Sequence, residues 1–297
     1  MKISRLLAVV LTLGFMAGPA VAGLVSNGLI GAHDAGVGWD GTNLNDANTG
    51  DGYDAVGTPT GGVTHTAASG SDPAYFSFAG SGDRINLDAL PTALGTADFT
   101  VQMWVNMTSG SEQWQHTGFL GNSLASGLTN GLAFGMLRGS AGKGLLVWTM
   151  GSAVPTDWGT TPPDDYQQST TGSQEGPLTD GTWHQMTIVR EAVGATSGIR
   201  IWMDETEITG SGDQLGDTVD MGLATMTMDI NGPYGTVGGR MKNGDKFNKL
   251  LVYNRALSQS EIEQNFNAGA AATVPEPASL TLLGIGAALV LLRRRRA

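Results

Sequence analysis

A turn pair followed by an alternating run stands in the second half of the chain: Asp180-Gly181-Thr182-Trp183-His184-Gln185-Met186-Thr187-Ile188-Val189-Arg190. The Asp-Gly pair is a turn signal, because glycine adopts backbone angles that other residues avoid. The residues after it alternate with the period of two that a β-strand requires. Gly198–Asp204 follows closely enough to be the hairpin partner of this strand. The stretch therefore predicts an antiparallel hairpin.

Short alternating segments between turn clusters recur on both sides of this hairpin. In Asp98–Met107, Val101 and Met103 share one face while Trp104 points the other way, so we expect this strand to be covered on both sides. The 45 glycines are spread along the chain and supply many turns. These features predict a two-sheet antiparallel sandwich. The further predicted strands are Ala74–Phe78, Arg84–Leu87, Gly118–Gly121, Leu132–Leu137, Leu145–Met150, Ala224–Ile230, Gly235–Gly239 and Phe247–Tyr253.

One helix is predicted near the end of these strands. Ser258 and Glu261 form a capping box, in which each side chain satisfies a backbone donor of the first turn. Ile262 and Phe266 lie one turn apart on the same face, and Gly269 is suited to end the helix. We expect this helix to cover part of the sandwich.

Four motifs in order resemble the laminin-G-like or concanavalin A-like family, and the resemblance extends from about Tyr75 to Gly269. It implies an all-β jelly-roll sandwich with one short helix. It also implies that Trp183 is a core side chain, while His184 is interpreted as a structural or surface histidine. The motifs are Gly80-Ser81-Gly82-Asp83-Arg84-Ile85-Asn86-Leu87, Asp98-Phe99-Thr100-Val101 with Trp104-Val105, Asp180-Gly181-Thr182-Trp183-His184, and Tyr253-Asn254-Arg255-Ala256-Leu257-Ser258 leading into Glu261-Ile262.

The N-terminal residues 1–22 have the three parts of a secretory signal peptide. Lys2 and Arg5 precede an apolar run from Leu6 to Met16, and small residues end in Ala20-Val21-Ala22. The run is shorter than the roughly 20 residues that span a bilayer. We expect export and cleavage near Ala22, which leaves residues 23–269 as one domain.

Residues 274–297 form a second targeting segment, joined to the domain by the linker 270–273. Pro275, Glu276 and Pro277 precede an apolar stretch from Ala278 to Leu292, and Arg293, Arg294, Arg295 and Arg296 follow. This order resembles the PEP-CTERM sorting signal. The resemblance implies transient insertion in the inner membrane, cleavage near Pro-Glu-Pro by an exosortase, and delivery to the cell surface or extracellular matrix. A plain tail anchor is the alternative.

The composition limits the partners of the domain. The two ends contain six of the 16 lysines and arginines but only one of the 27 acidic residues, so the body carries a net charge of about −16. Such a charge argues against nucleic acid and anionic lipid as partners and is compatible with divalent cations or neutral glycans, without deciding between them. The chain has no cysteine, so its stability does not depend on disulfides.

The sequence contains no strong catalytic signature, and we expect no enzymatic activity. Glu205 and Glu207 are the nearest approach to the paired carboxylates of a glycosidase. Glycanases of the resembled family carry a longer acidic strand pattern, and this pair stands where lectin-like members have a turn. We therefore interpret both residues as charges at a hairpin tip.

A structural calcium ion is a further expectation. Residues 45–52 are dense in the carboxylate and amide oxygens that calcium prefers, with Asp46 and Asp51 as the candidate ligands. The family resemblance adds the closing strand, where many relatives have a calcium-binding aspartate and this chain has Asn248. An ordinary polar turn is the alternative.

A long polar loop at residues 154–176 is the candidate sugar-binding segment. It contains Trp158, Asp164, Asp165 and Tyr166. Aromatic faces stack on sugar rings, and carboxylates bind sugar hydroxyls. A Trp packed onto the sandwich is the alternative reading. The sequence thus predicts an exported, noncatalytic protein that binds extracellular polysaccharide, with a purely structural matrix protein and a glycan-cleaving enzyme as the alternatives.

Overall fold

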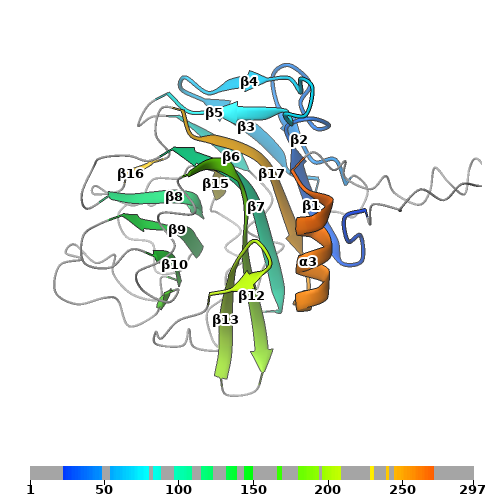
Figure 1. Cartoon of the computed structure of the whole chain (residues 1–297), viewed down its shortest axis with the longest axis vertical. Helices are drawn as coiled ribbons and strands as arrows, with labels where there is room; N and C mark the ends of the chain where they lie inside the picture. Colours follow the sequence, from blue (N-terminus) through cyan, green and yellow to red (C-terminus); the bar gives the residue numbers. More distant parts are fainter. Residues whose placement is uncertain are drawn as a thin grey trace, which may run out of the picture.

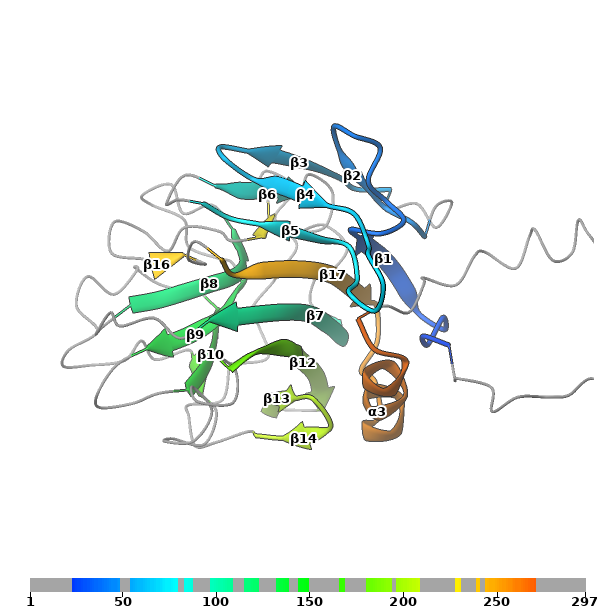
Figure 2. The ribbon, with the colours of Figure 1, turned by 45° about the horizontal axis from the view of Figure 1, so that its top comes forward.

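Two antiparallel sheets pack face to face, and one helix lies on the outside of the first sheet (Figures 1 and 2). The structure is a computed structural model. It describes residues 23–48, 54–79, 83–87, 97–108, 115–122, 132–138, 144–149, 166–168, 180–193, 196–208, 228–230, 239–240 and 244–270. The predicted all-β sandwich is confirmed.

The first sheet has the strand order β14-β13-β12-β7-β17-β5-β4, and β1 also pairs with β17. Its strands are β1 (Leu29–Asp34), β4 (Thr64–Thr66), β5 (Tyr75–Ser77), β7 (Phe99–Thr108), β12 (Asp180–Val193), β13 (Thr196–Met203), β14 (Thr206–Glu207) and β17 (Lys246–Tyr253). The predicted hairpin is β12–β13, in which Ile188 lies opposite Ile201.

The second sheet has the order β11-β10-β9-β8-β15-β6-β3-β2, and β16 pairs in parallel with β8. Its strands are β2 (Leu44–Asn45), β3 (Val56–Thr60), β6 (Arg84–Leu87), β8 (Gln115–Asn122), β9 (Leu132–Arg138), β10 (Gly144–Thr149), β11 (Tyr166–Gln168), β15 (Met228–Ile230) and β16 (Gly239–Arg240).

The main hydrophobic core lies between the sheets. Val101 and Met103 of β7 contact the same buried cluster as Ile85 and Leu87 of β6. Trp104, the residue directly after Met103, belongs instead to a smaller cluster on the outer face of the first sheet. The prediction that β7 is covered on both sides is confirmed, because residues of alternate parity enter two different cores.

Helix α3 (Gln259–Ala268) covers one end of this outer face. Its cap is Ser258, whose backbone N–H donates to the Glu261 carboxylate at 2.9 Å, and it ends at Gly269, as predicted. Ile262 is buried in the outer cluster. Phe266, one turn after Ile262, is only partly buried, and Asn265 takes the second buried position of the helix.

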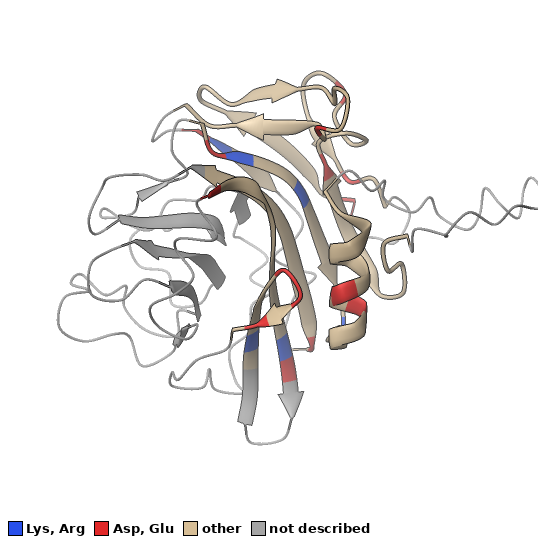
Figure 3. Cartoon of the chain, viewed as in Figure 1, with Lys and Arg blue, Asp and Glu red and all other residues tan. Residues whose placement is uncertain are grey.

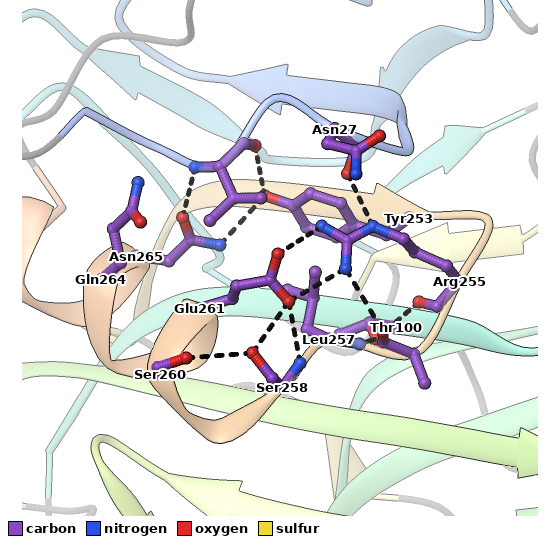
Figure 4. A network of polar contacts seen from close by, with 12 residues as sticks. Asn27, Thr100, Tyr253, Arg255, Leu257, Ser258, Ser260, Glu261, Gln264 and Asn265 are labelled. Carbon is purple, nitrogen blue, oxygen red and sulfur yellow. Dashed lines mark hydrogen bonds and ion pairs between the residues drawn. The ribbon is translucent and has the colours of Figure 1, made fainter.

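Asn265 can be buried because both polar atoms of its amide group form hydrogen bonds (Figure 4). Its Oδ1 accepts the backbone N–H of Val25 at 2.7 Å, and its Nδ2 donates to the hydroxyl of Tyr253 at 3.0 Å and to Oε1 of Gln102. The Tyr253 hydroxyl donates in turn to the carbonyl of Val25 at 3.0 Å. The helix, the closing strand and the start of the domain are therefore joined through one side chain.

An ion pair supports the first turn of the same helix. Arg255 donates to both carboxylate oxygens of Glu261, at 2.7 and 2.9 Å, and its Nε donates to the carbonyl of Asn27 (Figure 4). The arginine and the Ser258 N–H lower the pKa of Glu261 to about 2. The carboxylate is thus ionised through the physiological pH range, and its negative charge interacts favourably with the positive end of the helix dipole.

Among the residues that the structure describes, no helix has the length and apolar character needed to span a bilayer. The predicted signal peptide, Pro275–Pro277 and Arg293–Arg296 lie outside the described residues.

Replacement of the buried amide tests the importance of this joint. Asn265→Ala is expected to lower the free energy of unfolding by about 3 kcal/mol, because it leaves several buried donors and acceptors unpaired. Asn267→Ala is the matched control on the exposed side of the helix, and we expect it to cost less than about 1 kcal/mol. Urea unfolding measures both variants, and equal effects would contradict the assigned role of Asn265.

Candidate functional site

A row of side chains crosses the outer face of the first sheet beyond the end of helix α3. Trp183 lies opposite Asn106, and Lys246 lies opposite both Asn106 and Ser77. Directly opposite residues of antiparallel strands project on the same side. The neighbouring Phe247 belongs to the core between the sheets, so the row faces outward. The outer-face patch is defined as Thr64, Tyr75, Ser77, Asn106, Trp183 and Lys246.

Two aromatic rings lie at the centre of this patch. The centroids of Tyr75 and Trp183 are 6.4 Å apart, and the ring planes are inclined by 54°. Their strands, β5 and β12, are separated by β7 and β17, so the two side chains lean toward each other across Asn106. Asn106 is consequently only 7% exposed, whereas both rings are partly accessible. The patch thus offers partly open aromatic surface.

The ammonium group of Lys246 lies on the same surface. Its Nζ is 4.7 Å from the centroid of the Tyr75 ring, a cation–π contact. In the described part of the chain, no carboxylate lies within ion-pairing distance of Lys246. Other described cations are paired: Lys249 with Asp34, Arg200 with Glu191, and Arg255 with Glu261. Figure 3 shows how few lysines and arginines the described ribbon carries.

A β-bulge orients Trp183 toward the patch. Pairing with β7 shifts register between Asp180 and Trp183, and Gly181 in this bulge has a φ of 82°. Nδ2 of Asn106 donates to the carbonyl of Gly181 at 2.7 Å and holds the bulge in place. The Asp-Gly pair therefore initiates the strand through a bulge, the kind of site where glycine is favoured.

The expectation that Trp183 is a core side chain is met only in part. Trp183 packs against the outer cluster but is partly exposed. Strand alternation assigns Trp183 to the same face as Val189, which is fully buried in that cluster. The two residues differ in how far other parts of the protein cover them, and strand alternation does not predict this.

His184, on the other side of the strand, is held between two carboxylates. Its Nδ1 is 2.9 Å from Oδ2 of Asp204, and its Nε2 is 3.2 Å from Oδ1 of Asp180. The hydrogen bond to Asp204 contributes most to raising the pKa of His184. In the protonated ring both nitrogens donate, which matches two carboxylate acceptors. The ring is 8% exposed, so His184 acts as a structural histidine.

Asp204, one of the two aspartates that contact His184, connects strand β12 to the β13–β14 turn. Oδ1 of Asp204 accepts the backbone N–H of Gln185 at 2.9 Å, and Asp204 itself has a φ of 55° in the β13–β14 turn. Glu205 and Glu207 are exposed at this turn and strand, in agreement with their interpretation as hairpin-tip charges. The cluster thus supports β12 on the side opposite Trp183.

The sugar-binding residues expected from the sequence are not part of the outer-face patch as the structure describes it. Tyr166 is the first residue of β11, at the edge of the second sheet, and only its backbone is described. Trp158, Asp164 and Asp165 lie outside the described residues.

The described calcium candidates have other partners. Oδ1 of Asp46 accepts the backbone N–H groups of Ala32 and Asn48 at 2.9 and 2.8 Å. Nδ2 of Asn248 donates to the carbonyl of Ala74 at 2.7 Å. Among the described residues, no three His, Cys, Asp or Glu side chains are grouped to hold a metal. These contacts do not test the expected calcium site, which includes Asp51 outside the described residues and stays a prediction.

The fold and the open aromatic face define a lectin-type sandwich. The sequence model of the concanavalin A-like lectin/glucanases superfamily matches residues 79–263, and the chain belongs to this family. Residues 273–296 match the PEP-CTERM protein-sorting motif, which implies export and processing by an exosortase. Comparison with curated proteins finds no match.

Solved structures resemble the chain in fold. A Trypanosoma rangeli sialidase in complex with 2,3-difluoro-KDN matches with a TM-score of 0.54 at 16% identity, over 85% of this chain and 34% of the sialidase. The binding domain of botulinum neurotoxin DC in complex with SialylT matches with a TM-score of 0.51 at 14% identity, over 81% of this chain and 51% of the toxin domain. The chain therefore spans about a third to a half of these proteins.

The histidine cluster predicts a pH dependence of stability. Because the pKa of His184 is raised in the folded state, its stabilising effect is complete below its ordinary pKa of 6.5 and is lost as the pH rises through the folded value. The urea midpoint of the wild type is expected to fall as the pH is raised from about 6.5 through the folded-state pKa of His184, and His184→Asn should remove most of this fall. His65→Gln, a histidine replacement elsewhere, should retain it. The same fall in His184→Asn as in the wild type would refute the assignment.

Proposed function

We propose that this protein is an exported, noncatalytic glycan-binding protein and that the outer-face patch is its binding surface. The observation that carries the proposal is the Tyr75–Trp183 ring pair beside Lys246 on a sheet face left open by helix α3. Aromatic faces stack on the apolar side of sugar rings, and a few nearby polar groups orient the hydroxyls.

The shape of the patch supports an extended ligand. The row from Trp183 to Thr64 crosses β12, β7, β17, β5 and β4, a length of about 19 Å at the usual strand spacing. Hydroxyl groups occupy its far end, where Thr64 Oγ1 and Ser77 Oγ lie 2.7 Å apart. A row of this length suits several sugar rings of one polysaccharide chain.

The comparisons are compatible with this proposal. The family includes lectins, and one similar structure is a toxin binding domain in complex with SialylT. Because a shared fold does not determine function, the proposal depends on the patch and not on these relatives.

The final location of the protein also forms part of the proposal. We infer that an exosortase removes the tail near Pro275-Glu276-Pro277 and delivers the domain to the cell surface or extracellular matrix. The start of the domain lies next to helix α3, since Nε2 of Gln264 donates to the carbonyl of Gly23 at 2.7 Å. Any attachment retained after residue 270 would therefore be close to the mature N-terminus.

A glycosidase needs paired carboxylates, and the only pair singled out in the sequence is Glu205 and Glu207. Because this pair lies at an exposed turn, we favour binding over catalysis. Oε1 of Glu205 accepts from Nδ2 of Asn267 on helix α3 at 2.9 Å, a positioning contact at an exposed turn. A purely structural matrix protein is the remaining alternative, and it predicts protein partners and no glycan binding. Release of reducing sugar that is lost in a Glu205→Gln, Glu207→Gln double variant would instead establish a glycanase.

Binding to a glycan array, followed by titration of the best oligosaccharide, tests the site. Trp183→Ala and Tyr75→Ala are each expected to weaken binding about tenfold or more, because each removes a stacking surface. Trp158→Ala is the comparison, since it lies in the loop favoured by the sequence, and it should bind like the wild type. Loss of binding in Trp158→Ala alone would transfer the site to residues 154–176.

Mass spectrometry of the secreted protein tests the processing. The mature chain is expected to lack Arg293–Arg296, and deletion of the exosortase should leave them attached. Recovery of an intact arginine tail on extracellular protein from cells with an active exosortase would refute this part of the proposal.

A further inference from the structure

We propose that the outer-face patch selects glycans that carry carboxylate groups, such as chains containing uronic acids, with Lys246 as the residue that confers the selectivity. This inference rests on the proposed glycan-binding function and specifies its ligand. It arises from the position of one ammonium group beside two aromatic rings.

Lys246 differs from Lys249, Arg200 and Arg255 in its surroundings. Lys249, only three residues further along β17, is fully buried and forms an ion pair with Asp34 at 3.1 Å. Arg200 and Arg255 are likewise bound to carboxylates. Lys246 is partly accessible and, in the described part of the chain, contacts an aromatic ring in place of a carboxylate. Its charge is therefore available to a ligand.

The contact with Tyr75 positions the ammonium without using its donors. A cation–π contact engages the charge but leaves N–H groups of the ammonium to point toward a bound molecule. A sugar ring stacked on Tyr75 or Trp183 would bring an attached carboxylate within reach of Nζ. A hydrogen bond between an ammonium and a carboxylate is stronger than one between neutral groups.

The local charge of the patch agrees with an acidic ligand, although the whole domain is negative. The row Trp183, Asn106, Lys246, Ser77 and Thr64 contains one positive and no negative side chain. At physiological salt, charges more than about 8 Å away are strongly screened. The carboxylates elsewhere on the domain thus lower the association rate of an acidic glycan more than they weaken its contact with Lys246.

A pair of ligands that share the same sugar rings and differ in the charge of their carboxyl groups, which are methylated in one of them, tests this inference. Oligogalacturonate and its methyl ester have the same rings, and titration calorimetry gives the dissociation constant of each. The wild type is expected to bind the acid about tenfold more tightly than the ester, and high salt should reduce the difference. Lys246→Gln should bind both with the affinity of the ester, while Lys246→Arg should keep the preference.

Two control variants separate the possible outcomes. Arg200→Gln removes one positive charge elsewhere on the sheet and should leave the preference unchanged, and thermal melts confirm that each variant is folded. Equal binding of acid and ester by the wild type, or a preference that survives in Lys246→Gln, overturns the selectivity and leaves the proposed function standing. No binding to either ligand or to any array glycan refutes the proposed function as well.

Discussion

Among the described residues, one short helix covers part of the outer face of the first sheet, and this limited cover determines the character of the rest of that face. Ten helical residues extend about 15 Å, whereas seven strands side by side span about 29 Å. Trp104, Tyr253 and Leu251 lie beneath the helix and are almost fully buried. In the described part of the chain, the same strands carry beyond the helix the partly exposed Lys246 and two partly exposed aromatic rings, with Asn106 buried beneath the rings. The candidate site is the uncovered part of a face whose other part is core.

The site is supported by polar contacts on both sides of β12. On the outer side, Asn106 fixes the bulge at Gly181. On the inner side, His184 joins Asp180 to Asp204. Trp183 lies between these contacts in the chain, so its backbone is restrained before any ligand arrives. Restraint of this kind reduces the ordering cost of binding. The helix is attached by comparable means, through Asn265 and the Arg255–Glu261 ion pair, which keeps its end away from the patch.

Much of the fold follows from local sequence pattern. The hairpin β12–β13, the strand Arg84–Leu87 and the cap at Ser258 were all predicted from turn residues, alternation and capping chemistry, and the structure confirms them. Strands β1 to β4 were not predicted. Val56–Thr60 contains Pro59 and no apolar alternation, so only its pairing with β6 and β2 defines it as a strand. Asn265 likewise looks like a surface residue until Val25, from the other end of the chain, is placed beside it.

The candidate site was beyond sequence reasoning for a related reason. Tyr75, Asn106, Trp183 and Lys246 come from four strands far apart in the chain, and only the register of those strands brings them together. Alternation predicts a strand at Trp183 but not how far the cover of that strand extends, so it does not reveal that Trp183 is partly open. The acidity of the whole domain likewise does not predict the charge of the patch, which is positive.

The central claim is that a glycan contacts the uncovered face beside helix α3. The chain has seven tryptophans, and their indole N–H signals can be followed by NMR during titration with the bound oligosaccharide. Our account predicts that the signal assigned to Trp183 shifts in proportion to occupancy, while those of the buried Trp104 and Trp202 stay unchanged. A titration that shifts the Trp158 signal and leaves Trp183 unaffected would contradict it.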